Sequence, residues 1–539
     1  MTHNTIDELR ALALRKPQDS YLTISVAMAL DELDERSEAL RWARQAVTID
    51  PDNADLRVQF GRFCASAGEL DEAVQAYEAA IRLAPADSDA YRELGLLYLD
   101  RVGDPETAMR TVSRGVQLAP GDISLWIGVA RCCLAGTDAH TALRTASRLV
   151  PAASPSILNK AFAQALNLCG RYEEAATCAE AVLGANPRDG FALTILASIA
   201  TGQNRFDDAV GLYERALETH PVLPVAAVFH LFELVRRGDY ERACAAFKVR
   251  RPLLEHCMAR TREIPLWNGE ALAGKTIRLL SYPPSGLGDT IHFARFARVL
   301  SGLGATVVLT CQQKLVRLVS RIPGVSFATT KYRPSPPADF EFDLYYLWFA
   351  LNVPLPRAGE QLPYVSTAAT AIRARPGALK VGLNWAGAPV RRDNPYTCRS
   401  MPFDALAPLA ELEGVDFFSL QGSPESHALT RTESLLKPVD LGSDVTDFED
   451  LASAIASMDV IVTVDTSIAH LAGAMRIPVL LLLPYSACWR WLTGRDDTPW
   501  YPATELYRQA KPGDWTGPVE SVRKRLATTI RQRAASASS

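Results

Sequence analysis

Four residues late in the chain combine an acid, two hydroxyls and an imidazole within one short stretch: Asp465, Thr466, Ser467 and His470. The β-branched run 460–464 before them predicts a buried strand, and small residues at helical spacing after them predict a helix. A helix that begins here points unpaired N–H groups outward, which suits an anion such as phosphate. The alternative is an ordinary capped helix, with Asp465 or Thr466 as the N-cap and His470 packed nearby.

A glycine-rich turn earlier in the chain, Gly286-Leu287-Gly288-Asp289, supplies another acid. The turn follows a predicted strand, 276–282, and opens a predicted helix. Its glycines would let a ligand approach the backbone closely. Asp289 is then either a helix cap or a carboxylate placed as a general base.

Two more polar segments follow predicted strands. Trp385 ends one strand and leads into the arginine-rich loop 391–400, which contains Arg399 and Ser400, and Gln421 follows the next strand. Several guanidinium groups near a strand end suit a diphosphate, although exposed arginines are more often simply solvated.

The elements that would position these residues alternate between strands and helical stretches. Such alternation predicts doubly wound parallel sheets, which bind ligands at the carboxyl ends of their strands. A stretch with Pro and Arg near 374–377 separates two sets, so we expect two Rossmann-like domains facing across a cleft. The predicted strands are 276–282, 306–310, 342–347, 380–385, 415–420, 460–464 and 479–483.

The first half of the chain repeats itself, with prolines at intervals of 31 to 36 residues. Ala73 and Ala80 flank Tyr77, and the same arrangement recurs at 209–216, while a degenerate last unit is expected over 223–252. The pattern resembles the tetratricopeptide repeat, in which small residues let paired helices approach and proline closes the unit. The prolines are Pro17, Pro51, Pro85, Pro120, Pro151, Pro187 and Pro221.

Such arrays curve, and their concave face usually holds a peptide or a partner surface. We therefore expect the array to recognise a protein partner. A rigid spacer or a dimerisation arm is the alternative.

The composition excludes several classes of protein. Fifty-seven basic and 61 acidic residues among 539 give a net charge of -4, so no broad basic face for nucleic acid is expected. No apolar run approaches the roughly 20 residues that span a bilayer, and the start has no secretory-signal pattern. The ten cysteines are scattered without a CxxC pair, which predicts reduced thiols rather than a disulfide frame or a zinc site. We therefore expect a soluble cytoplasmic protein.

Taken in order, these segments make the second half of the chain resemble the GT-B glycosyltransferases related to the ADP-heptose heptosyltransferase family. That family pairs a Gly-Asp turn with a basic loop and an Asp-Thr-x-x-x-His-Leu turn, matched here by Gly288-Asp289, Arg399-Ser400 and 465–471. The whole chain is similar to bacterial proteins that join tetratricopeptide repeats to this fold, among them flagellin-modifying glycosyltransferases. Further matching motifs are Trp489-Arg490-Trp491, Thr498-Pro499-Trp500-Tyr501-Pro502, Arg508-Gln509 and Gly513-Asp514-Trp515.

The resemblance implies an inverting glycosyltransferase that uses a nucleotide-sugar donor and holds no permanent cofactor. No Asp-x-Asp pair with metal-ligand spacing follows a predicted strand, so we expect no essential metal. Asp289 would be its general base, and the repeats would capture a protein acceptor, for which the resemblance suggests flagellin. A single histidine such as His292 is expected to be structural. The expected donor-binding residues are Gly286, Gly288, Trp385, Arg399, Ser400, Gln421, Asp465, Thr466, Ser467 and His470.

Two departures from the family pattern keep alternatives open. Pro283-Pro284-Ser285 stands where an acid and a glutamine usually precede the glycine-rich turn, and Cys488 stands where an acid is common. One alternative is a non-catalytic repeat scaffold with a degenerate GT-B domain. The other is a glycosyltransferase that acts on lipid-linked or polysaccharide acceptors.

The expected organisation is an α-solenoid of tetratricopeptide repeats followed by an α/β GT-B fold. A basic final helix is expected over 519–533, which in GT-B proteins often returns to the first sheet domain. The expected domains are the repeat array (1–252), a linker (253–275), an acceptor-side Rossmann-like domain (276–375), a donor-binding Rossmann-like domain (376–515) and a C-terminal helix with a disordered tail (516–539).

Overall fold

The computed structural model describes residues 6–33, 35–134, 138–149, 154–254, 264–281, 286–353, 362–387, 399–422 and 434–537. Contacts divide the chain into two compact units, Met1–Ala226 with Lys331–Pro334, and Ala227–Thr330 with Ser335–Ser539. The division falls inside helix α14 (Pro224–Arg236), so α14 and α15 (Tyr240–Leu254) lie mainly in the second unit. In the described ranges, no helix is both long and apolar enough to cross a membrane.

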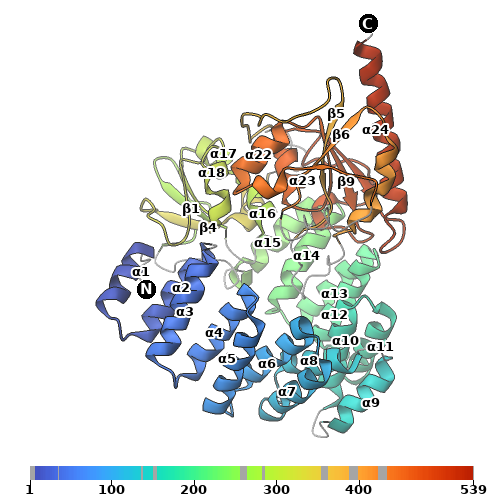
Figure 1. Cartoon of the computed structure of the whole chain (residues 1–539). Helices are drawn as coiled ribbons and strands as arrows, with labels where there is room; N and C mark the ends of the chain where they lie inside the picture. The colour runs from blue at the N-terminus through green and yellow to red at the C-terminus, as the bar shows by residue number, and fades with distance from the viewer. Residues whose placement is uncertain are drawn as a thin grey trace. The chain divides into compact units, whose positions relative to one another are not determined.

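The first unit is built of α-helices that pack as consecutive pairs (Figure 1), which confirms the helical array that the proline spacing predicted. A π-helical turn, Tyr98–Val102, extends α6. The helices are α1 (Ile6–Arg15), α2 (Ser20–Glu32), α3 (Arg36–Ile49), α4 (Ala54–Ala67), α5 (Leu70–Leu83), α6 (Ser88–Leu97), α7 (Pro105–Leu118), α8 (Ile123–Leu134), α9 (Ala139–Leu149), α10 (Pro155–Leu168), α11 (Tyr172–Ala185), α12 (Gly190–Gly202) and α13 (Phe206–Thr219).

A short motif recurs at the turns of this array, in which a proline is followed two residues later by Asp or Asn. After Pro51, the Asn53 side chain accepts a hydrogen bond from Leu56 N at 3.1 Å. Asp189 caps α12 in the same way, accepting from Ala192 N at 3.0 Å. The cap satisfies an N–H group that the first helical turn leaves unpaired. The proline follows the end of one helix, and the Asp or Asn two residues later caps the start of the next. The spacing of the prolines therefore equals the length of the repeat.

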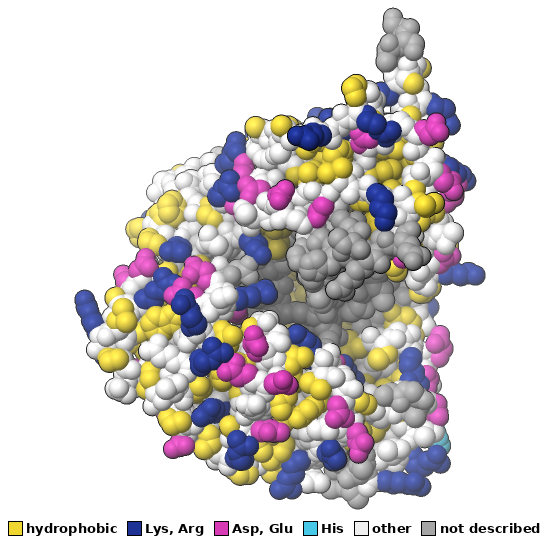
Figure 2. All heavy atoms as spheres, in the orientation of Figure 1, with side chains coloured by type: hydrophobic (Ala, Val, Ile, Leu, Met, Phe, Trp, Pro, Cys, Tyr) yellow, Lys and Arg dark blue, Asp and Glu magenta, His cyan; other side chains and the backbone are white. Residues whose placement is uncertain are grey.

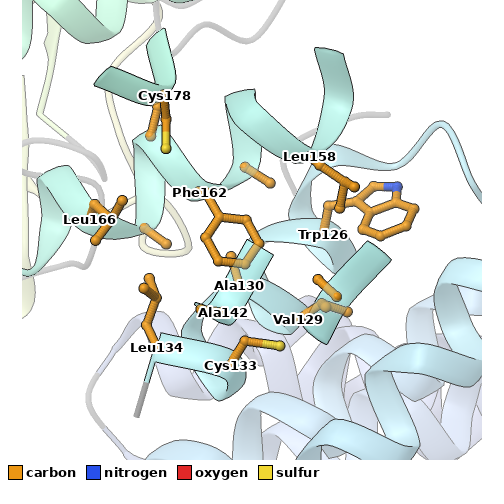
Figure 3. Close-up of a cluster of buried hydrophobic side chains, with 14 of the residues drawn as sticks. Trp126, Val129, Ala130, Cys133, Leu134, Ala142, Leu158, Phe162, Leu166 and Cys178 are labelled. Carbon is orange, nitrogen blue, oxygen red and sulfur yellow. The ribbon is translucent and has the colours of Figure 1, made fainter. Parts of the chain in front are cut away.

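Small residues let the paired helices approach. A Cβ atom added at Gly61 of α4 would lie 2.6 Å from Cε1 of Tyr77 on α5, so glycine is required there. Ala73 and Ala80 on either side of Tyr77 are fully buried. A larger apolar cluster spans α7 to α12 and includes Trp126 and Phe162 (Figure 3). Burial of each such side chain stabilises the fold by about 1.5–3 kcal/mol.

The first sheet of the second unit has four parallel strands in the order β3-β2-β1-β4. The central strand β1 (Thr276–Leu280) has β2 (Thr306–Thr310) on one side and β4 (Phe340–Asp343) on the other, and β3 (Phe327–Thr329) forms an edge. The carboxyl ends of β1 and β4 therefore meet, since Leu280 pairs with Asp343.

The second sheet has six parallel strands in the order β10-β9-β8-β5-β6-β7. Numbered within this sheet, the order is the doubly wound 3-2-1-4-5-6, which reverses between β5 and β8. All five residues of β8 and of β9 are buried, as expected for strands covered on both faces. The strands are β5 (Leu379–Asn384), β6 (Val415–Ser419), β7 (Val439–Asp440), β8 (Val460–Val464), β9 (Val479–Leu483) and β10 (Thr504–Arg508).

The two parallel α/β sheets confirm the predicted GT-B type of architecture, with differences in detail. The strands β3, β7 and β10 were not predicted; β3 and β7 are short edge strands. The predicted strand 342–347 is wrong beyond Asp343, because the Asp343 side chain accepts a hydrogen bond from Tyr345 N at 2.8 Å and starts a helical turn. That turn, η3 (Leu344–Tyr346), continues into α19 (Leu347–Leu351).

The final helix, α24 (Thr516–Ala537), packs against the second sheet. Its Val519, Val522 and Leu526 lie in the same apolar cluster as Leu379 and other residues of the second sheet. The expectation that it returns to the first sheet domain is therefore wrong. The helix also reaches into the segment 534–539 for which we expected disorder.

Charges of both signs are distributed over the face that Figure 2 shows, with cationic and anionic side chains interspersed. This distribution agrees with the near balance of 57 basic and 61 acidic residues in the sequence. The described side chains on that face form no large single-sign patch of the kind that a nucleic-acid backbone requires.

Candidate functional site

The two predicted motif segments meet where helix α16 (Leu287–Ala294) packs against helix α23 (Ser467–Ala474), which lie side by side in Figure 1. A Cβ atom at Gly288 would lie 2.8 Å from Cδ2 of His470 and 3.3 Å from Cα of Ser467. Only glycine therefore permits this approach. Residues 179 positions or more apart in the sequence are brought into one cluster, which we call the α16–α23 site.

Asp289 acts as a helix cap and also faces this site. One carboxylate oxygen, Oδ2, accepts a hydrogen bond from Gly286 N at 2.7 Å and so satisfies the first turn of α16. The other oxygen, Oδ1, forms an ion pair with Arg490, and 21% of the Asp289 side chain stays exposed. The cap and the general base, which the sequence left as alternatives, are thus compatible in geometry.

Arg490 is a buried cation of the site and lies in the turn η7 (Trp489–Trp491), which follows β9. Its guanidinium carbon lies 4.5 Å from the Trp489 ring centroid and 5.6 Å from that of Tyr345. Burial alone disfavours the charged form, but the nearby Asp289 carboxylate holds the pKa of Arg490 well above its usual value. The guanidinium is therefore a permanent positive charge beside Asp289.

The second acid, Asp465, is 6% exposed and lies at the carboxyl end of β8. Burial raises the pKa of Asp465 above the ordinary aspartate value, and the positive charge of Arg399 opposes that shift. Arg399 lies near the helix start, since a Cβ at Gly387 would be 3.2 Å from both Arg399 Nε and Thr466 Cγ2. Among the described residues, the buried Nε of Arg399 has no hydrogen-bond partner.

Thr466 is the N-cap of α23, and its Oγ1 accepts a hydrogen bond from Ile468 N at 3.3 Å. The same hydroxyl donates to Asn384 Oδ1 at 2.8 Å, which ties α23 to the end of β5. The capped-helix alternative is thus correct for Thr466. The Ser467 residue that begins the helix is only partly buried and lies against Gly288.

Two histidines share one tyrosine hydroxyl. Tyr501 Oη lies 2.9 Å from Nδ1 of His292 and 3.0 Å from Nδ1 of His470. Burial lowers the pKa of both imidazoles well below the usual value, and the charge of Arg295 lowers both further. Both rings are therefore neutral near pH 7, and the ring of Trp491 stacks on that of His470 at 5.2 Å.

Gln421 and Trp385 contribute to the frame of the site. Gln421 Oε1 accepts hydrogen bonds from Asn384 Nδ2 at 2.7 Å and from the backbone N–H groups of Trp385 and Ala386 at 3.2 Å and 3.0 Å. The Trp385 ring is 2% exposed and packs in the apolar core on Phe403, so its side chain is not brought to the cluster. Ser400 is exposed, and its Oγ accepts from Gly387 N at 3.1 Å.

The sequence motifs that contain Arg490, Tyr501 and Trp491 predict no role for these three residues. Their contacts with Asp289, His292 and His470 join residues 21 to 209 positions apart, which no local pattern reveals. His292, expected to be structural, is buried and contacts the hydroxyl that His470 uses. Most of the arginine-rich loop, 391–398, and the segment Pro283–Pro284–Ser285 lie outside the described residues.

Comparison with protein families identifies three segments of the chain. Residues 61–100 match a TPR repeat model, and residues 170–224 match a tetratricopeptide repeat model. Residues 402–493 match the model of glycosyltransferase family 9 (heptosyltransferase), whose members use nucleotide-sugar donors. This segment contains β6 to β9, α23 and Arg490.

Relatives also match over longer stretches. The chain is 24% identical to Protein FlbA of Caulobacter vibrioides over 98% of its own length and 90% of that protein. Among solved structures, it is similar to YrrB, described as a TPR protein with an unusual peptide-binding site, at 17% identity over 40% of this chain and 95% of YrrB, with a TM-score of 0.22. A tetratricopeptide repeat protein from Parabacteroides merdae is 16% identical over 46% of this chain and 85% of that one, with a TM-score of 0.28.

Proposed function

The chain joins tetratricopeptide repeats to a glycosyltransferase family 9 (heptosyltransferase) domain, and on this premise we propose that it transfers a sugar from a nucleotide-sugar donor to a protein. In this proposal the repeats capture the acceptor, and flagellin is the first acceptor to test. Transfer is direct and inverts the anomeric centre, without an essential metal ion.

One observation carries the proposal. The packing of α16 on α23 brings a partly exposed carboxylate, Asp289, together with the groups suited to an anion. These groups are the Arg399 guanidinium and the start of α23 at Ser467. An acid and an anion site side by side are what direct transfer from a sugar phosphate requires.

The chemical step then needs only these residues. The acceptor hydroxyl oxygen attacks the anomeric carbon, and its proton passes to Asp289. The bond between that carbon and the phosphate oxygen breaks, and the nucleotide leaves with the electron pair. The negative charge that develops on the leaving phosphate is stabilised by Arg399 and by the N–H groups at the start of α23. In this proposal His470, which is neutral and lies in the same helix, hydrogen-bonds that phosphate.

The ion pair with Arg490 does not remove Asp289 from this role. An ionised carboxylate has about four lone-pair positions. The ion pair with Arg490 uses Oδ1 of Asp289, and the hydrogen bond from Gly286 N uses Oδ2, so each oxygen has one of these contacts. Positions for the acceptor proton therefore remain, and the two contacts orient the carboxylate.

A thermal-shift panel tests the donor site. Purified protein is heated with UDP-, GDP-, ADP- and CMP-sugars, beside the variants Arg399→Ala and Asp289→Asn. A ligand at about 100 times its Kd adds roughly 2.7 kcal/mol to the free energy of unfolding. We expect one nucleotide class to raise the midpoint in the wild type and in Asp289→Asn, and much less in Arg399→Ala.

Transfer is then measured by intact-mass spectrometry of flagellin incubated with that donor. A mass increase of one sugar, absent with Asp289→Asn, supports the proposal. If the protein binds a donor but transfers sugar only to a lipid-linked or polysaccharide acceptor, then the acceptor is of that class and is not a protein. A folded protein that binds none of the donors contradicts the enzyme and favours a repeat scaffold.

A further inference from the structure

Helix α14 belongs by sequence to the helical array, yet its C-terminal half packs against the turn that carries Arg490. The Phe232 ring stacks on the Trp489 ring, with centroids 5.0 Å apart and planes 9° apart. Arg236, one turn further along α14, donates a hydrogen bond to the backbone carbonyl of Ala487. Two side chains of one helix thus contact residues on the N-terminal side of Arg490.

Trp489 lies close to a further indole, that of Trp348 in α19. The Trp348 ring lies nearly parallel to it, at 6.5 Å and 7°, on the α19 side. Phe232 also makes an edge-to-face contact with Tyr345 at 5.5 Å, and Tyr345 Oη lies 3.5 Å from Arg490 Nη2. Offset and edge-to-face aromatic pairs each contribute about 0.5–1.5 kcal/mol beyond burial. Phe232 therefore touches two of the three aromatic rings that lie around the Arg490 guanidinium, namely Tyr345 and Trp489. The third ring is that of Phe293.

Arg490 connects the aromatic rings around it to the Asp289 carboxylate through an ion pair. It is 6% exposed, and its contacts include the ion pair with Asp289 and a hydrogen bond to Cys488 Sγ at 3.0 Å. A guanidinium so enclosed has little freedom to follow the carboxylate, so the position of the turn sets the position of the charge. Misplacement of a reacting group by about 1 Å can cost roughly 100-fold in rate.

We propose that Phe232 of α14 is a positioning residue for the transfer reaction. By fixing Trp489 it fixes Arg490, and Arg490 holds the Asp289 carboxylate in the orientation that accepts the proton. The kinetic part of this inference rests on the proposed function, whereas the mechanical part, that α14 fixes the 487–490 turn, does not.

The neighbouring helix α15 supplies a matched control. Phe247 is 1% exposed and stacks on Tyr346 at 5.9 Å and on Phe349 at 5.6 Å. Phe232 is buried to a similar degree, at 4% exposure. Leucine at either position removes an aromatic ring from the same helical pair and keeps the site apolar. Of the two phenylalanines, Phe232 is the one whose ring stacks on Trp489.

The kinetic test compares Phe232→Leu with Phe247→Leu in the full-length protein. We expect Phe232→Leu to lower kcat about 10- to 100-fold, with the KM for the donor within about 2-fold of the wild-type value. Phe247→Leu should keep kcat within about 2-fold. Because Phe232 acts through Arg490, the double variant with Arg490→Met should lose no more than Arg490→Met alone.

A second measurement needs no substrate. Cys488 is 8% exposed and bonded to Arg490, so alkylation of its thiol reports the order of the turn. N-ethylmaleimide labelling of the Cys488 peptide, followed by mass spectrometry, should be several-fold faster in Phe232→Leu than in the wild type and in Phe247→Leu. If the wild type transfers no sugar, the proposed function fails while this labelling still decides whether α14 fixes the turn.

Three outcomes would overturn the inference. One is a folded Phe232→Leu protein with wild-type kcat. Another is equal Cys488 labelling in the wild type and both leucine variants. The last is an equal loss of kcat in Phe232→Leu and Phe247→Leu, which would mark a general effect of loosening the helical pair.

Discussion

Each sheet has one aspartate near the junction of a strand and the helix that follows it, and the surroundings of the two differ. Asp289 lies in the first turn of α16, whereas Asp465 lies between β8 and the N-cap of α23. Asp289, after β1, keeps 21% of its side chain exposed and pairs with Arg490. Asp465, after β8, is 6% exposed, and burial raises its pKa. The same side chain is thus open and paired in one sheet, but enclosed in the other.

The difference in exposure between Asp289 and Asp465 suits the two carboxylates to different chemical roles. A partly exposed carboxylate that a cation holds in place can exchange a proton with an incoming hydroxyl. A buried carboxylate with a raised pKa weakens the fold when it ionises, so Asp465 is not expected to stabilise the fold in its charged form. Its position beside Arg399 agrees with the donor-binding role that we propose for this part of the site. Four predictions test this division, from the largest expected effect to the smallest.

The largest effect is expected at Asp289. Asparagine keeps an oxygen that can accept the Gly286 N–H, so α16 should remain capped while the base is lost. We expect kcat to fall about 10²- to 10⁴-fold, with donor affinity little changed. Initial rates at saturating donor measure this, and a wild-type rate in folded Asp289→Asn would end the role of Asp289 as base.

Loss of the Arg399 cation should act on binding. Hydrogen bonds to charged groups contribute about 1.5–3 kcal/mol, which corresponds to roughly 10- to 100-fold in Kd. Calorimetric titration of Arg399→Ala with the donor found in the thermal-shift panel should show this loss, and Arg399→Lys should recover part of it. Equal affinity in the wild type and Arg399→Ala would mean that the phosphate lies elsewhere.

The histidine pair should make the free energy of unfolding decrease as the pH falls. Because burial lowers the pKa of His292 and His470, the unfolded chain binds protons that the folded chain does not once the pH falls below about 6.5. Stability is then fully present above that pH and is lost on further acidification, by up to about 1.4 kcal/mol per pH unit for each histidine. Urea unfolding at several pH values gives the free energy of unfolding as a function of pH. Between about pH 6.5 and lower pH values, this free energy should fall less steeply in His292→Gln than in the wild type. An equal pH dependence in the two proteins would contradict the prediction.

The smallest effect is a stability gain in Asp465→Asn. The pKa of Asp465 is raised in the folded state, so its contribution to stability is present below about pH 4 and is lost as the pH rises through the folded pKa. An asparagine side chain never ionises, so the variant should have a higher Tm than the wild type at pH 7, and the difference should shrink below about pH 4. A lower Tm at pH 7 would mean that the carboxylate stabilises the fold.

The sequence predicted most of what repeats or alternates. Proline spacing and the paired small residues sufficed for the helical array, because each unit is closed by local contacts such as the Asn53 cap. Strands such as β8 and β9 could be predicted because burial on both faces requires an unbroken apolar run. Edge strands such as β7, with both of its residues exposed, carry no such pattern.

The sequence predicted only those parts of the site whose residues lie close together in one short segment. The Asp465–His470 stretch could be read locally, but the pairing of Asp289 with Arg490 joins residues 201 positions apart. The Trp385 side chain illustrates the opposite error, since a residue at a strand end can point into the core. Spacing shows which residues share a turn, whereas tertiary packing decides which turns face each other.

The continuity of α14 bears on how such proteins can be recombined. An exchange of recognition modules between relatives would naturally be cut near residue 252, after the last helical pair. That cut replaces Phe232 and Arg236, whose contacts with Trp489 and Ala487 lie within the transferase unit. A chimera joined before Pro224 would instead keep the native α14 and α15 together with the second unit. If the repeats select the acceptor as we propose, such a chimera should change the acceptor and keep the contacts of the 487–490 turn.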